Sequence, residues 1–180
     1  MPRLPAIAPE TLTGEQKRVY DKIAETRGQV RGPFAIWLNA PQLAEACLQL
    51  QNTLNHHSRL DPRLMQLMIL VMARRSSAQF AWYAHARHAE KVGLAANIVE
   101  AIRTRSDPPF ERDDERLIYD LAVELDTTRT LSDASYERAL AALNREQLVE
   151  LVVAVGFYVM VAMTLNAFDA PVPGGARPLS

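Results

Sequence analysis

The chain has 180 residues, which fits one domain, and 48% of them are hydrophobic, enough for a sizeable core. A formal net charge of −1 argues against nucleic acid or an anionic membrane as a partner. The single cysteine, Cys47, excludes an internal disulfide and a dithiol redox pair. The N-terminal segment lacks the apolar run of a signal peptide, so we expect a protein of the reducing cytoplasm.

The chain begins with a segment that predicts no regular structure. Residues 1–12 contain three prolines and predict an extended arm, of a kind that packs on a neighbouring subunit. Thr13 and Gln16 have the spacing of a capping box, which predicts a helix to about Arg27. A loop from Gly28 to Phe34 and a short apolar turn should follow.

A second capping box is predicted at Asn39 and Gln42. The helix that follows should bury one apolar face, on which Cys47 is ordinary core rather than a reactive thiol. The residues of this face are Leu43, Ala46, Cys47, Leu50 and Leu54. At the end of the helix, His56 and His57 are expected to cap the last carbonyls or to lie at the edge of a pocket.

The central stretch, residues 61–93, predicts two helices joined by a polar break at residues 74–77. Asp61 can cap the first helix, and Gly93 can end the second in a left-handed conformation. The first helix is apolar on almost every side, which indicates that it is buried all round. Gln66 is the exception in that run, so its side-chain amide needs hydrogen-bond partners.

The second central helix places His85 on its inward face, one turn after Trp82. His85 is either a core histidine or a general acid/base in a mostly apolar pocket. The substrate-binding candidates are aromatic or imidazole side chains that could wall this pocket, although aromatic residues at helical spacing are more often packing. These candidates are Trp82, Phe34, Tyr158 and His88.

The remaining sequence predicts helices and no strands. We expect helices over about 95–104, 111–127, 133–143 and 145–168, the last opened by Asn144 and Gln147, and then an irregular tail over residues 171–180. The sequence therefore predicts one all-α domain over residues 1–180, a bundle of about eight helices.

Other chemistries have weaker support. There is no phosphate-binding loop, dinucleotide-binding turn or serine nucleophile elbow. A metal site needs three or four clustered ligands, and the four histidines (His56, His57, His85 and His88) have no carboxylate in register beside them. We therefore expect neither a metal nor a cofactor.

Several segments resemble the carboxymuconolactone decarboxylase family, which is related to the alkyl hydroperoxidase D-like proteins. The matching residues lie in the central helices and in two outer segments, in the order and spacing of the family. They are Leu64–Ala73, Phe80–Ala86, Ala89 and Gly93, then Gly32–Phe34 with Ala40–Glu45, and Gly156–Tyr158 with Leu165–Phe168.

The resemblance implies an all-α fold that forms homotrimers or hexamers. In the redox branch of the family, a glutamate, a Cys-x-x-Cys pair and a histidine form a proton relay. By spacing, those positions are Gln66, Ala78, Ala81 and His85, so only the histidine is present. Without the two thiols, disulfide reductase or peroxidase chemistry by that mechanism is not available.

The lactone-decarboxylase branch needs no thiol. The leading hypothesis is therefore a cofactor-free lyase or proton-transfer enzyme, of the kind used in aromatic degradation, acting on a small carboxylated lactone or unsaturated acid. His85 would transfer the proton and Gln66 would fix its tautomer. The alternative is a non-catalytic oligomeric scaffold or small-molecule binder, because relatives have glutamate where this chain has Gln66 and Ala81.

Overall fold

The computed structural model describes residues 2–179, and over this range the chain contains helices and no strand, as predicted. The described part has nine α-helices. The predicted number was about eight, and the additional one is α2, where the sequence predicted only a turn. The helices are α1 (Gly14–Arg27), α2 (Pro33–Trp37), α3 (Pro41–Asn52), α4 (Pro62–Arg75), α5 (Gln79–Lys91), α6 (Ala96–Thr104), α7 (Asp113–Thr128), α8 (Asp133–Ala142) and α9 (Arg145–Ala167).

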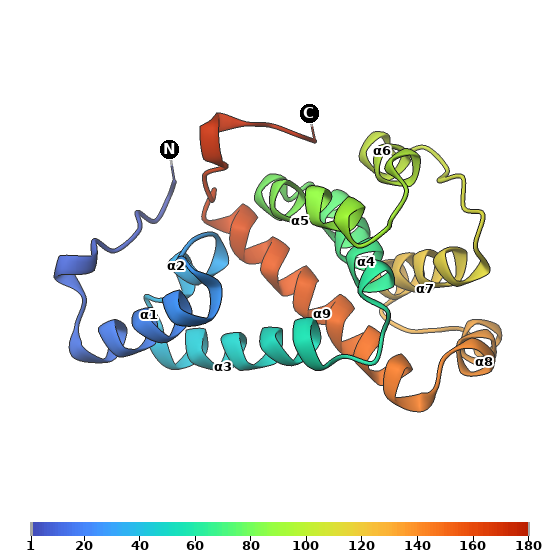
Figure 1. Cartoon of the computed structure of the whole chain (residues 1–180), viewed down its shortest axis with the longest axis horizontal. Coiled ribbons are helices and arrows are strands. Elements are labelled where there is room, and N and C mark those ends of the chain that lie inside the picture. Colours follow the sequence, from blue (N-terminus) through green and yellow to red (C-terminus); the bar gives the residue numbers. More distant parts are fainter. Residues whose placement is uncertain (1, 180) are drawn as a thin grey trace.

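The long helix α9 crosses the middle of the molecule, with α1, α2 and α3 towards one end and α6, α7 and α8 towards the other (Figure 1). Helix α4 packs against α5, α7 and α9. Every residue from Arg63 to Ala73 is buried, which confirms the prediction that this helix is enclosed on all sides. A helix without a polar face is stable in water only where neighbours cover its whole circumference.

Local signals set most of the helix ends. Thr13 with Gln16, and Asn144 with Gln147, both form the predicted capping boxes. The Asp61 carboxylate accepts a hydrogen bond from the Arg63 backbone N–H at 2.8 Å and caps α4. These side chains satisfy N–H groups that the first turn of a helix leaves without an intrahelical partner.

The prediction for the start of α3 was wrong. Its N-cap is Ala40, which has no capping side chain, while Asn39 donates a hydrogen bond back to the Ile36 carbonyl oxygen at 2.8 Å. The predicted buried face was also rotated: Leu43 and Leu50 are exposed. The buried face consists of Ala44, Cys47, Leu48 and Gln51, so Cys47 does lie in the core.

The N-terminal arm contacts the far end of the same chain. The backbone N–H of Arg3 donates to the Phe168 carbonyl oxygen at 3.0 Å, and its guanidinium donates to the Ala167 carbonyl oxygen at 3.2 Å. Both ends of the chain consequently lie on the same side of the molecule (Figure 1). The expected packing of this arm on a neighbouring subunit stays a prediction.

Candidate functional site

The packing of α5 on α4 brings His85 and Gln66 together. The Nδ1 atom of His85 lies 2.9 Å from the Oε1 atom of Gln66, so the hydrogen bond by which Gln66 was expected to orient His85 is present. An amide oxygen only accepts hydrogen bonds, so with Gln66 in this orientation Nδ1 carries the proton and donates. The tautomer of the neutral ring is thereby fixed, with the lone pair on Nε2.

Among the described residues, every buried side-chain nitrogen or oxygen atom has a hydrogen-bond partner. The Nε2 atom of His85 has no such partner, so it is not buried and solvent can reach it. The residue as a whole is half-buried, but its ring lies between side chains of α4 and α9. Burial, and to a lesser extent the charges of His88 and Arg27, lower the pKa of His85 to about 4. The ring is therefore neutral at pH 7, a proton acceptor rather than a donor.

Tyr158 of α9 forms the third side of this cluster. Its ring meets the His85 ring edge to face, with centroids 5.7 Å apart and an interplanar angle of 89°. The Tyr158 hydroxyl donates to the Oδ1 atom of Asn55 at 3.3 Å, so its partner is a side chain rather than a backbone carbonyl. Burial raises the pKa of Tyr158 to about 12, which keeps the hydroxyl protonated.

Two cavities meet at His85 and His88. One, of about 430 Å³, lies towards α4 and includes Gln66, Asn55 and His56 in its wall. The other, of about 190 Å³, lies towards α1 and α9. The second is lined by Arg27, Arg31, Pro33, Gln51, Phe80, Ala81, Ala84, His85, His88, Tyr158, Val161 and Leu165. The predicted residues Gln66, His85, His88 and Tyr158 thus share one site.

Arg27, at the end of α1, is a site residue that the sequence did not reveal. Its guanidinium donates to the Gln51 side chain and lies 4.8 Å from the centre of the Phe34 ring. The residue is exposed as a whole, but its guanidinium is covered enough that burial lowers its pKa. No ion pair between described residues includes Arg27, so a positive charge faces the smaller cavity without a carboxylate partner.

Phe34 and Trp82 do not line either cavity among the described residues. Phe34 is fully buried and packs edge to face on Trp37, with centroids 5.2 Å apart. Trp82 is 2% exposed and belongs to the core cluster. In the single chain, neither predicted substrate contact presents a surface to a bound molecule.

The described residues contain no group of three or more histidine, cysteine or acidic side chains close enough to hold a metal ion. His56 and His57 fall in a single π-helical turn, Thr53–His57, that follows α3. Of the two, only His56 belongs to the wall of the larger cavity. The chemistry at the site therefore depends on imidazole, amide, phenol and guanidinium groups.

The fold is shared with several solved structures. An uncharacterized peroxidase-related protein from Silicibacter sp. TM1040 superposes with a TM-score of 0.77 at 16% identity, covering 94% of this chain and 90% of that one. An uncharacterized peroxidase-related protein from Ralstonia eutropha JMP134, described as an alkylhydroperoxidase AhpD core, gives 0.77 at 12% identity, with 96% and 93% covered. The chain has the AhpD-like fold.

A further solved structure that superposes on the chain is the debrominase Bmp8, in a cysteine-to-alanine variant bound to 2,3,4-tribromopyrrole. It superposes with a TM-score of 0.74 at 15% identity, covering 99% of this chain and 96% of that one. No model of a known protein family and no curated protein matches the sequence. At these identities the likeness establishes the fold, and the activity has to be inferred from the site.

In this chain the AhpD-like fold has no thiol at the site. Ala78 and Ala81, at the two positions where the redox pair is expected, are both buried small residues at the start of α5. Cys47 is buried in α3, and burial raises the pKa of its thiol. A buried thiol with a raised pKa is a poor nucleophile.

Proposed function

We propose that the protein is a cofactor-free proton-transfer enzyme acting on a small carboxylated lactone or unsaturated acid, with decarboxylation as the reaction to test first. The observation that supports it most directly is a neutral, solvent-reachable His85 Nε2 beside a guanidinium that has no carboxylate partner. A carboxylate substrate would supply the missing counter-charge.

The carboxylate of the substrate would bind Arg27, with Arg31 as a second cation in the same wall. Guanidinium–carboxylate pairs are planar and bidentate, so they fix the orientation of a ligand as well as its position. The rest of the substrate would lie against Phe80, Val161 and the Tyr158 ring. A cavity with two cationic side chains and an apolar part of its wall fits a small, partly unsaturated acid.

His85 would then change its charge when the substrate binds. A carboxylate within a few ångströms favours the imidazolium, so it raises the pKa from about 4 towards neutrality and the ring takes a proton from solvent. In the decarboxylation, the bond from the ring carbon to the carboxylate breaks and carbon dioxide leaves. The electron pair passes into the conjugated dienolate, and His85 delivers its proton to a carbon of that dienolate.

The test is the decarboxylation of carboxymuconolactone, followed by ultraviolet absorbance, with wild type beside His85→Ala and Gln66→Glu. We expect turnover in the wild type, none in His85→Ala, and an unchanged far-ultraviolet circular dichroism spectrum for that variant. Turnover that survives in His85→Ala would contradict the proposal.

Two outcomes distinguish the alternatives. A gain of activity in Gln66→Glu would indicate that the amide replaced an acid/base partner, because an amide does not exchange a proton at neutral pH. Absence of turnover with every lactone and unsaturated acid tried, together with saturable binding of the same compounds, would favour the non-catalytic small-molecule binder. A brominated pyrrole belongs in the same screen, since an AhpD-like neighbour binds one.

We also propose that the chain forms a homotrimer or hexamer in the cytoplasm. Helix α9 is long and apolar enough to cross a membrane, but half of its most apolar stretch is buried within the molecule, as in the core helix of a soluble protein. Its other face is an uncovered apolar stripe. The stripe comprises Val149, Val153, Met160 and Met163, with Gly156 at its centre, at successive helical spacings.

A second copy of the chain would cover this stripe, because Gly156 leaves open space in which another helix can approach closely. We expect Val153→Asp to convert an oligomer into a monomer, as measured by light scattering on a sizing column. Leu140→Asp, at an exposed leucine of α8, is the matched control and should leave the mass unchanged. Equal masses for both variants would count against the α9 interface.

A further inference from the structure

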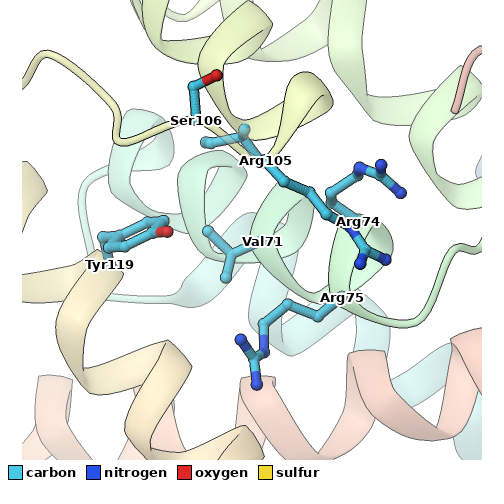
Figure 2. A pocket seen from close by; sticks show the side chains of 7 residues that line it. Val71, Arg74, Arg75, Arg105, Ser106 and Tyr119 are labelled. Carbon is cyan, nitrogen blue, oxygen red and sulfur yellow. The ribbon is translucent and has the colours of Figure 1, made fainter.

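A separate cavity lies at the other end of α4, where α4, α6 and α7 meet. It measures about 380 Å³ and shares no lining residue with the two cavities at His85. Its wall contains three arginines and three apolar or aromatic side chains, and Figure 2 draws all of them and labels all but Ile102. The lining residues are Val71, Arg74, Arg75, Ile102, Arg105, Ser106 and Tyr119.

One of the three arginines is neutralised. Arg75 donates to the Asp126 carboxylate at 2.5 Å and to the Thr127 hydroxyl at 2.8 Å. Its guanidinium accordingly turns away from the other two, towards α7 (Figure 2). Arg75 is thus a link between helices α4 and α7, and it contributes little free charge to the cavity.

The other two arginines have only neutral partners. The Nε atom of Arg74 donates to the Arg103 backbone carbonyl at 2.6 Å, and Arg105 donates to the Ser77 hydroxyl at 3.4 Å. Neither Arg74 nor Arg105 belongs to an ion pair with any residue in the range 2–179. Each guanidinium has five N–H donors, so most of the donors of both groups are free for a ligand.

The guanidinium groups of Arg74 and Arg105 appear on the same side of the cavity in Figure 2, and they are close enough for the charge of Arg105 to act on Arg74. Burial and the positive charges of Arg105 and Arg103 lower the pKa of Arg74. Two adjacent cations repel each other unless an anion lies between them, and such an anion gains charge-assisted hydrogen bonds from both sides. The pair is therefore arranged as an anion receptor rather than as two unrelated surface charges.

Apart from the arginines and Ser106, the wall of the cavity consists of apolar and aromatic side chains. Val71 and Ile102 are both buried, and the half-buried ring of Tyr119 stands opposite them. Burial of apolar ligand surface on these side chains adds to affinity roughly in proportion to area. We propose that this cavity binds a small organic anion, whose carboxylate or phosphate lies between Arg74 and Arg105 and whose apolar body rests on Val71, Ile102 and Tyr119.

The test is calorimetric titration of the full-length protein with benzoate, phenyl phosphate and acetate at constant ionic strength. The first two probes carry the same apolar body on different anionic groups, and acetate lacks that body. Because Arg27 can also bind a carboxylate, each titration is repeated in Arg27→Gln, which weakens the cavity at His85 and leaves the α4–α6–α7 cavity as the stronger anion site. We expect one saturable site in that variant, at least tenfold tighter for benzoate or phenyl phosphate than for acetate.

The deciding variant is Arg105→Gly. Arg105 ends α6 with φ 60°, a left-handed conformation that glycine adopts without strain, so this change removes the guanidinium without disturbing the fold. We expect it to weaken the site at least tenfold. Arg129→Gly is the matched control: Arg129 ends α7 with φ 63°, lies outside the cavity, and should leave the affinity unchanged.

Three results would overturn the proposal. One is the absence of saturable binding of both aromatic probes in Arg27→Gln, and another is equal affinity in Arg105→Gly and Arg129→Gly. The third is a smaller assembly for Arg105→Gly on a sizing column with anion binding intact, which would assign the two arginines to a carboxylate of a second copy. None of these results depends on turnover, so the site at His85 is tested independently.

Discussion

Arg63 and Arg27 show how the same side chain serves two purposes in this fold. Arg63, in α4, is 7% exposed and donates to the carboxylates of Glu115 and Asp114, the latter at 2.8 Å. Arg27 has a neutral amide, from Gln51, and an aromatic ring as its neighbours. The fold thus neutralises a guanidinium where it holds helices together, and leaves one without a counter-ion at the wall of a cavity.

The two settings respond differently to the loss of a partner. Removing one member of a buried ion pair leaves the other charge in a medium of low polarity without compensation. A guanidinium at a cavity wall keeps access to water, so its removal changes the binding of anions more than the stability of the fold. The following predictions test this difference, beginning with the largest expected effect.

Arg63→Ala should lower the free energy of unfolding by about 3–5 kcal/mol, because Glu115 is then buried without its partner. Urea denaturation followed by circular dichroism measures the change. The double variant Arg63→Met with Glu115→Leu should recover much of the loss, since it leaves no isolated charge. A loss below about 1 kcal/mol for Arg63→Ala would mean that the ion pair between Arg63 and Glu115 contributes little to the stability of the fold.

The neutral state of His85 predicts a loss of stability in weak acid. Its pKa is about 4 in the folded chain against 6.5 for the free side chain, so the unfolded chain binds more protons between these values. The stability due to this difference is present above pH 6.5 and disappears as the pH falls towards 4. It amounts to about 3 kcal/mol, from 1.36 kcal/mol for each pKa unit.

The measurement for this effect is the free energy of unfolding of wild type and His85→Gln from pH 7.5 to pH 4. As the pH falls from 7.5 to 4, the free energy of unfolding should decrease more for the wild type than for His85→Gln. Two parallel curves would show that His85 titrates normally in the folded protein.

Arg27→Gln should change the free energy of unfolding by less than about 1 kcal/mol, in contrast to Arg63→Ala. If a carboxylate substrate binds this guanidinium, KM should rise at least tenfold without a fall in kcat, because the departing carboxylate carries its full negative charge in the ground state and loses it as carbon dioxide forms. Steady-state kinetics with the substrate found by absorbance would check this. A fall in kcat at constant KM would instead assign Arg27 to the chemical step.

The smallest expected effects are at Arg105 and Arg129, the two arginines with a left-handed backbone conformation. Arg105→Gly and Arg129→Gly both relieve a conformation that costs L-residues about 1 kcal/mol, offset in part by the greater freedom of glycine in the unfolded chain. Arg105→Gly should be the more stable of the two by a few tenths of a kcal/mol, since it also removes repulsion from Arg74 whereas Arg129→Gly loses a contact with Asp126. Thermal denaturation at low ionic strength would show the order, and the opposite order would argue against two adjacent uncompensated cations.

Much of the fold could be predicted because its signals are local. The capping boxes at Thr13 and Asn144 act within one helical turn, and the apolar circumference of α4 already requires neighbours on every side. The start of α3 was missed because Asn39 has two partners within reach and bonds the preceding Ile36 carbonyl instead of the following N–H groups.

Only part of the site could be predicted. His85 and Gln66 were found because each is a polar residue on the inner face of an apolar helix, and 19 positions separate them. Arg27 joins the site across far more of the chain, through the packing of α1 on α3, and no periodicity carries that information. A signal existed in Gln51, a buried amide beside Leu48 and Cys47 that required a partner.

If the proposed proton transfer takes place, the hydrogen bond between His85 and Gln66 would also make turnover selective for charged molecules. At neutral pH the pair has no net charge, because the amide does not ionise and the imidazole keeps only the proton on Nδ1. A neutral ligand would leave the ring in that state. An anionic ligand would raise the pKa of the ring, which would then take up a proton. The acid needed for the reaction would therefore be created by the substrate itself, and only for as long as the substrate remains bound.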